Sequence, residues 1–306
     1  MESIITAGTP LPSDDMQDRI APLIKERAAW LFNDNFVARN SYRILNRLLG
    51  YDRTIALGNL LKDEPTDVIM SHMADMIAKD VQISGLENIP ATGPALVVCN
   101  HPTGIADGIM MWHAITQRRA DPFFYANSDI LRVMPQMTTM IAPVEWRLEK
   151  RSHAKTRETM AYTRKAIEAG RIGVIFPSGR LAKRRWLKLY EREWMASAAM
   201  IARKWDLDVI PVNVRARNSV LFYIFDMIHP SLRDITLFYE TLNKDKQPYR
   251  LTFGRPIPAS SLSTNSSEAI EELKAATLKL GGRHAPTVSL AEMTRRPRWK
   301  RSTLSA

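Results

Sequence analysis

The stretch that decides the fold is Ala95–Gly108, ALVVCNHPTGIADG, in which five apolar residues run directly into Asn100 and His101. A continuous apolar run of this kind is typical of a strand that is buried on both faces of a parallel sheet. A small Pro- and Gly-containing loop ends the strand, and a helix is expected to begin near Asp107. Because open parallel sheets bind ligands beyond the carboxyl ends of their strands, His101 is expected beside a ligand.

Similar apolar runs follow along the chain, and helical segments separate several of them. The runs are Phe123–Ala126, Met140–Val144, Ile172–Phe176, Val209–Val214, Ile235–Tyr239 and Arg250–Gly254, and Val81–Ser84, before Ala95, is a short strand candidate. The helical segments are Ile109–Gln117, Ser152–Ala169, Glu191–Lys204 and Glu268–Leu280. This alternation predicts an α/β fold, with a mostly parallel or mixed sheet flanked by helices.

The region before the first run has a different character. From Ile20 to Leu49 apolar residues recur at helical spacing with Arg and Lys between them, and Thr66–Lys79 is a further helical stretch. We therefore expect an N-terminal helical region over residues 1–80, an α/β domain over residues 81–282 and a basic tail over residues 283–306. The tail is either a solvated end or an electrostatic anchor for anionic lipid.

The composition of the chain limits which partners and which cellular compartment are expected. The formal net charge of +11 attracts a polyanion, which can be nucleic acid, an anionic membrane leaflet or a phosphorylated substrate. A single cysteine, Cys99, fits a reducing compartment. The N-terminus lacks a basic segment followed by an apolar one, so no secretory signal is expected, and no apolar run is long enough to span a membrane. These features favour a cytoplasmic protein that lies on a membrane.

His101 and Asp107 are the first candidates for chemistry. An imidazole, whose ordinary pKa lies near neutrality, can take a proton from a substrate hydroxyl. A nearby carboxylate would orient the ring and stabilise the imidazolium, as the aspartate of a catalytic triad does. A structural histidine that caps the following turn fits the same residues, so this segment alone leaves both interpretations open.

A second segment, Ile172–Arg180 (IGVIFPSGR), repeats the pattern of a buried strand that runs into a glycine-containing turn. Free backbone N–H groups in such a turn can hold anionic oxygens, and Arg180 can bind a phosphate through two hydrogen bonds. A plain turn followed by a solvated basic face is the alternative.

Together and in this order, the two segments resemble the glycerolipid (phospholipid/glycerol) acyltransferase family, which carries Asn-His-x4-Asp and, farther on, Phe-Pro-Glu-Gly-Thr-Arg. The lead-in Gly85–Pro90 (GLENIP) matches the family's approach to the histidine strand. Ile141–Arg147 lies where the family has its second block, and Ile210–Val212 where it has its fourth. The resemblance covers residues 81–215.

The resemblance implies that a fatty acyl group moves from acyl-CoA or acyl-carrier protein to a hydroxyl of glycerol-3-phosphate or a lysophospholipid. His101 would be the general base, and Asp107 would orient it. The residues that would bind the acceptor are Arg147, Ser178, Gly179 and Arg180. No metal or other cofactor is implied. The implied partners are the acyl donor and the inner face of a membrane, where the protein would be peripheral; nucleic acid is not among them.

Two departures from the family pattern bear on the acceptor. The spacing here is His-x5-Asp, one residue longer than usual, and Gly104 can absorb the extra residue because glycine adopts backbone angles closed to other residues. Ser178 stands where the family usually has Glu. Both features are similar to the hemolysin-like branch, which includes lyso-lipid and ornithine-lipid acyltransferases. A lyso-aminolipid acceptor therefore stays open, as does a non-catalytic member that binds lipid or carrier protein.

Basic and aromatic residues alternate in Lys183–Trp194, a pattern that nucleic-acid-binding grooves also show. The alternative is a membrane-facing rim with Trp186 and Trp194 at the interface. Ser178 does not lie in a Gly-x-Ser-x-Gly elbow, and the remaining histidines have no metal-ligand spacing. We therefore interpret the chain as a membrane-surface acyltransferase.

Overall fold

The computed structural model describes residues 15–145, 152–282 and 287–290. Four helices precede the first strand, with the 3₁₀ turn η1 (Ala29–Phe32) after the first of them. They are α1 (Met16–Arg27), α2 (Phe36–Leu48), α3 (Tyr51–Leu61) and α4 (Thr66–Ile77). Asn35 begins α2, because its side-chain oxygen accepts a hydrogen bond from the Ala38 N–H at 2.7 Å.

The central sheet has seven strands in the order β1-β9-β8-β2-β5-β3-β4. In chain order they are β1 (Val81–Ser84), β2 (Ala95–Cys99), β3 (Pro122–Asn127), β4 (Ile141–Val144), β5 (Ile172–Ile175), β8 (Val209–Arg215) and β9 (Tyr249–Phe253). Neighbouring strands are parallel except β8 and β9, which are antiparallel. The mostly parallel, mixed sheet predicted from the apolar runs is thus confirmed.

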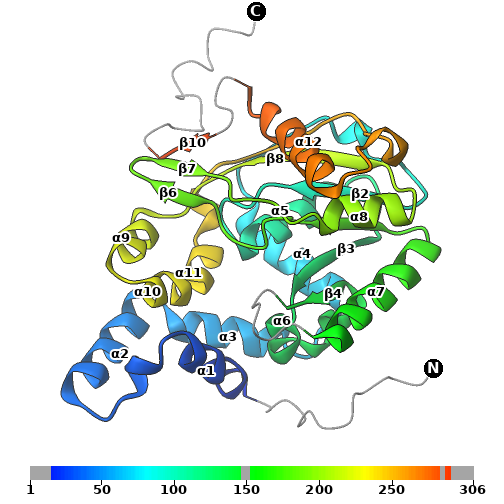
Figure 1. Ribbon diagram of the computed structural model, residues 1–306. Coiled ribbons are helices and arrows are strands. Elements are labelled where there is room, and N and C mark those ends of the chain that lie inside the picture. Colours follow the sequence, from blue (N-terminus) through cyan, green and yellow to red (C-terminus); the bar gives the residue numbers. More distant parts are fainter. Residues whose placement is uncertain (1–14, 146–151, 283–286, 291–306) are drawn as a thin grey trace, which may run out of the picture.

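Helices cover both faces of this sheet (Figure 1). On one face α5 (Ile105–Ile115) packs beside α4; on the other lie α7 (His153–Glu168), α8 (Ser197–Lys204) and α12 (Ser266–Lys279). All five residues of β2 are buried, which explains why its sequence is apolar without alternation. The central strand therefore delivers Asn100 and His101 to the carboxyl edge of the sheet.

The strand predicted at Ile235–Tyr239 is wrong. These residues end α10 (Pro230–Ile235) and begin α11 (Leu237–Leu242), and with α9 (Val220–Ile228) they form a helical insertion between β8 and β9. Pro230 occupies the first turn of α10, where its missing N–H costs nothing. A short apolar run does not distinguish a strand from a helix. Here it packs against α2 and η1 instead of entering the sheet.

The helix predicted over Glu191–Lys204 is shorter than expected and begins at Ser197. Residues 191–196 lie outside any helix or strand, and before them comes the hairpin of β6 (Lys183–Arg185) and β7 (Lys188–Tyr190). With β10 (Thr287–Ser289) this hairpin makes a small antiparallel sheet. Within the described residues no helix is both long and apolar enough to span a bilayer.

Candidate active site

His101 lies two residues after the end of β2, and its ring faces Asp107 in the first turn of α5. Nδ1 of His101 lies 3.0 Å from Oδ2 of Asp107, with 19% of the histidine side chain exposed and none of the aspartate. The two groups are at ion-pair distance, although they are not aligned as in a regular hydrogen bond. Phe176 packs on the imidazole with ring centroids 4.3 Å apart. Nε2 is therefore the ring nitrogen left to meet a substrate.

Asp107 is held in place by its own loop. Its carboxylate accepts hydrogen bonds from the Thr103 N–H at 2.8 Å, the Thr103 hydroxyl at 2.6 Å and the Gly104 N–H at 3.0 Å. The hydroxyl of Tyr249, from β9, bonds in turn to the Thr103 hydroxyl. Burial raises the pKa of Tyr249 well above its usual value, so the phenol stays protonated and can donate. This chain of contacts fixes the carboxylate opposite the histidine.

The long His-x5-Asp spacing is accommodated at Gly104, as its position in the loop predicted. Gly104 has φ 96° and ψ −133°, a region that side chains other than glycine rarely enter. A Cβ on this residue would also lie 3.2 Å from Cδ2 of Leu181. The extra residue is thus absorbed in the loop, and Asp107 still reaches His101.

Gly104→Ala is expected to lower turnover by at least about tenfold, because a small displacement of Asp107 misaligns the general base. It should also destabilise the fold by about 1–3 kcal/mol, the usual cost of a side chain in such a backbone conformation. Gly108→Ala is the matched control: Gly108 lies inside α5, and an added Cβ there meets no atom within 4 Å. Thioester turnover and thermal unfolding measure both effects. Wild-type turnover in Gly104→Ala would contradict the role given to this loop.

The second motif forms a tight turn after β5. Gly179 has φ 57°, and its N–H donates to the carbonyl of Phe176 at 2.9 Å. The buried Ser178 hydroxyl donates to the carbonyl of Arg180 at 2.8 Å. The hydrogen bonds of Ser178 and Gly179 therefore shape the turn, while Arg180 is exposed at its tip. Arg147 lies outside the described residues.

Glu191 is a further residue of the site, and no local pattern in the sequence points to it. Its carboxylate accepts the backbone N–H of His101 at 3.2 Å and the indole N–H of Trp194 at 3.0 Å. Burial raises the pKa of Glu191, and these hydrogen bonds oppose the shift. Trp194 is only 6% exposed, so the expectation that it lies at a membrane rim is wrong, whereas Trp186 is 90% exposed.

Asn100 joins β2 to β8 at the same edge of the sheet. Its amide donates to the carbonyl of Val214 at 2.8 Å and accepts the N–H of Val214 at 2.7 Å. This amide takes the place of a backbone partner where β2 ends, so it fixes the strand end that carries His101. Asn100 is the asparagine of the Asn-His motif, so the sequence already contained the pattern that marks this residue.

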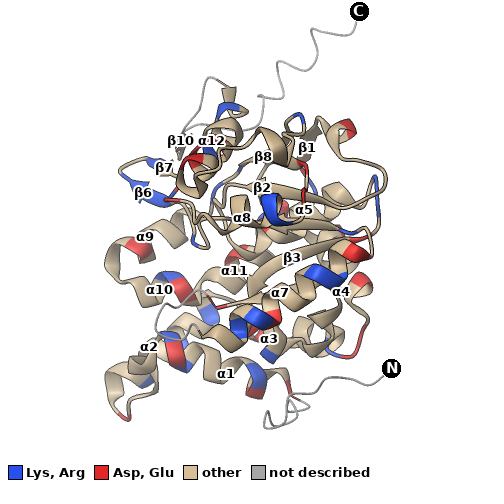
Figure 2. Ribbon diagram, turned by 45° about the vertical axis from the view of Figure 1, so that its right-hand side comes forward, with Lys and Arg blue, Asp and Glu red and all other residues tan. Residues whose placement is uncertain are grey.

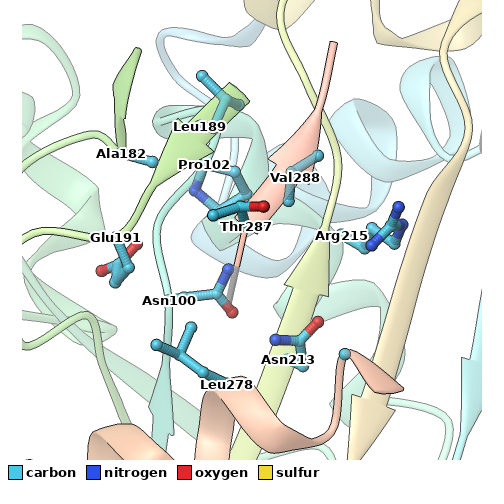
Figure 3. Close-up of a pocket in the computed structure, with 11 residues that line it drawn as sticks. Asn100, Pro102, Ala182, Leu189, Glu191, Asn213, Arg215, Leu278, Thr287 and Val288 are labelled. Carbon is cyan, nitrogen blue, oxygen red and sulfur yellow. The ribbon is translucent and has the colours of Figure 1, made fainter. Parts of the chain in front are cut away.

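A small pocket lies beside the histidine loop (Figure 3). Asn100 and Pro102, which flank His101 in the chain, contribute to its wall. The other lining residues come from the hairpin, β8, β10 and the end of α12: Ala182, Leu189, Glu191, Asn213, Arg215, Leu278, Gly281, Thr287 and Val288. Polar and apolar side chains therefore meet next to the candidate base.

Comparisons with known proteins identify relatives of the chain. The model of the Acyltransferase family matches residues 80–215, the span that holds both motifs. A lyso-glycine lipid O-acyltransferase of Phocaeicola vulgatus is 25% identical over 226 residues, which cover 70% of this chain and 78% of that protein. A protein of the same description from Bacteroides thetaiotaomicron is 23% identical over 235 residues, or 74% of this chain and 83% of the relative.

Among solved structures, the 1-acyl-sn-glycerophosphate (LPA) acyltransferase PlsC of Thermotoga maritima is similar with a TM-score of 0.47 and 13% identity. The match covers 79% of this chain and 96% of that one. The family match and the two relatives agree with the resemblance seen in the Asn-His and Phe-Pro motifs. The chain is therefore an acyltransferase, with the family match over residues 80–215, and it is similar to acyltransferases whose names specify a lyso-glycine lipid.

Proposed function

We propose that this enzyme moves a fatty acyl group from a thioester donor to the hydroxyl of a lyso-lipid with an anionic head group, of the lyso-aminolipid type. The observation that carries the proposal is the 3.0 Å contact between His101 and the fully buried Asp107 at the carboxyl edge of the sheet. The names of the two relatives support an aminolipid acceptor over glycerol-3-phosphate or a lysophospholipid.

In the proposed mechanism Nε2 of His101 takes the proton of the acceptor hydroxyl as its oxygen attacks the thioester carbonyl. The new C–O bond forms, the C–S bond breaks, and the proton passes from the imidazolium to the leaving thiolate. Asp107 stabilises the imidazolium and holds the ring orientation, the role an aspartate has in a catalytic triad. General-base catalysis of this kind contributes about 10²–10⁴-fold. The acyl donor is acyl-CoA or acyl-carrier protein.

Arginine side chains supply positive charge beside this site. Arg180 is exposed at the tip of the Phe-Pro-Ser-Gly-Arg turn, and the Nε–H of Arg192 donates to the carbonyl of Leu181 at 2.8 Å. Burial lowers the pKa of Arg192, and the nearby charges of Arg180 and Arg233 lower it further. An anionic head group would relieve this repulsion while it accepts hydrogen bonds from Arg180. Arg147 is proposed as an additional contact to the head group.

The test is acceptor-dependent release of free thiol from palmitoyl-CoA by the purified protein. A lyso-glycine lipid, a lyso-ornithine lipid, lysophosphatidate and glycerol-3-phosphate are offered separately. The expected result is release with a lyso-aminolipid at a rate at least about tenfold above that with glycerol-3-phosphate. Preference for glycerol-3-phosphate would overturn the acceptor assignment. If neither palmitoyl-CoA nor palmitoyl-acyl-carrier protein supports release with any acceptor, the proposed activity is wrong.

A further inference from the structure

Exposed apolar side chains gather on one side of the molecule. In the described part of the chain, most of the large exposed apolar residues belong to α2, the β6–β7 turn and α9. These three elements lie along the same edge of the molecule in both ribbon views (Figures 1 and 2). The residues of this docking face are Phe36, Val37, Ile44, Leu48, Trp186, Leu187, Val220, Ile224, Met227 and Ile228.

Helix α2 has three separate stripes along its surface. Ala38 and Leu45 are buried on the side that faces the protein. Helical periodicity places three exposed apolar residues on a second stripe: Val37, Ile44 and Leu48. It places three exposed cations, four residues apart, on a third: Arg39, Arg43 and Arg47. An apolar stripe next to a basic one is the pattern of a helix that lies in a membrane interface.

Helix α9 is apolar on its outer side as well. Val220, Ile224, Met227 and Ile228 are 47–73% exposed and share one side of the helix, since they are spaced at i, i+4, i+7 and i+8. Its charged residue, Asp226, is paired with Arg184 at 3.6 Å and Arg233 at 3.3 Å. The outer side of α9 therefore offers apolar surface without a charge of its own.

Trp186 occupies an unusual position at the tip of the hairpin. It is 90% exposed and has φ 54°, a backbone conformation that favours glycine. A tryptophan in this backbone conformation destabilises the fold, and its exposed ring makes no packing contacts that offset the cost. We therefore infer that its side chain serves binding and not folding. Indole rings are enriched where a membrane meets water. The exposed cations on either side of this tip are Lys183, Arg185 and Lys188.

We propose that the docking face binds an anionic lipid bilayer, with Trp186 and the outer side of α9 among the head groups and the neighbouring cations on lipid phosphates. The proposal rests on the proposed function, because a lyso-lipid acceptor resides in such a bilayer. The net charge of +11 has the matching sign. A second copy of this chain is a poorer occupant, since a two-fold contact would bring these cations against themselves.

The docking face adjoins the candidate active site. The hairpin follows the Arg180 turn closely in the chain. Between them, the N–H of Ala182 donates to the carbonyl of His101 at 2.9 Å. Leu189 of the hairpin packs with Phe222 and Tyr223 of α9 in one buried cluster. Contact with a bilayer through this face therefore brings the His101 loop close to the lipid, so the acceptor reaches Nε2 from the interface.

The test is co-sedimentation of the full chain with vesicles of equal parts phosphatidylglycerol and phosphatidylcholine, compared with phosphatidylcholine alone. We expect binding to the anionic vesicles that weakens as salt is added. The double variant Trp186→Gly/Leu187→Ser and the variant Met227→Ser should each bind at least about tenfold more weakly. Glycine suits the positive φ of residue 186, so the double variant is expected to fold.

Met200→Ser is the matched control, because Met200 is 55% exposed on α8, away from the docking face (Figure 1). It should bind vesicles as the wild type does, and so should His101→Ala, which separates docking from catalysis. Wild-type binding by both docking-face variants, or an equal loss in Met200→Ser, would overturn the proposal. So would a lipid-free dimer that the docking-face variants dissociate while vesicle binding is unchanged. Vesicle binding without acyl transfer would leave docking intact and overturn only the proposed function.

Discussion

His101→Ala is expected to lower acceptor-dependent thiol release by about 10²–10⁴-fold, the usual contribution of a general base. The variant removes the only imidazole that contacts Asp107 among the described residues. The ring is partly exposed and its neighbour Phe176 packs mainly against the core, so the fold should tolerate the change. The measurement is single-turnover release from the thioester, together with the temperature of thermal unfolding.

His72→Ala provides the control, because His72 is exposed on α4. It should keep wild-type turnover. An inactive His101→Ala with an unchanged unfolding temperature assigns the loss to chemistry. Retention of most of the activity by His101→Ala would rule out the general-base mechanism, whatever the acceptor.

Glu240→Ala is expected to destabilise the protein by about 3–5 kcal/mol, the cost of leaving one partner of a buried ion pair uncompensated. Lys244 and Glu240 are 0% and 1% exposed, and their charged atoms lie 3.0 Å apart. Nζ of Lys244 also donates to Oδ1 of Asn218 at 2.7 Å, after the end of β8. Glu240 accepts the Ser219 N–H at 2.8 Å, so the pair also secures the start of α9.

Urea unfolding measures this effect, and Glu271→Ala is the control. In α12 the exposed Glu271 pairs with the half-buried Lys274 at 3.5 Å, and the loss of this pair should cost less than about 1 kcal/mol. Burial lowers the pKa of Lys244, and Glu240 opposes that shift. The deficit of Glu240→Ala should therefore shrink as pH rises, because a neutral amine needs no partner. A deficit equal to that of Glu271→Ala would show that this pair does not hold the insertion.

The predictions from sequence succeeded where neighbouring residues decide the structure. The run ALVVC predicted the central strand, since a segment buried on both faces must be apolar at every position. The Asn-His and Phe-Pro-Ser-Gly-Arg motifs predicted an acyltransferase through their resemblance to that family's motifs, and the Acyltransferase model matches the span that holds both. The role of Gly104 also followed from the sequence, as only its backbone can take up the extra residue.

Contacts between residues far apart in the chain could not be predicted from the sequence. Tyr249 bonds to Thr103, which is 146 residues away in the chain, and so supports Asp107; Glu191 accepts the N–H of His101, which is 90 residues away. Neither position carries a local pattern. The contacts exist only once β9 has joined the sheet next to β8 and the segment around the hairpin has packed against the His101 loop.

The sequence by itself determined most of the strands, because local periodicity encodes them. It predicted the reaction class through the resemblance of its two motifs to those of known acyltransferases. Only the tertiary structure decided that Ile235–Tyr239 is helical, that Trp194 is buried and that Trp186 is exposed. The local sequence around a tryptophan in a basic segment does not show whether its side chain is buried or exposed. Its environment depends on which surface the hairpin and the α9–α11 insertion cover, and that follows from packing between segments far apart in the chain.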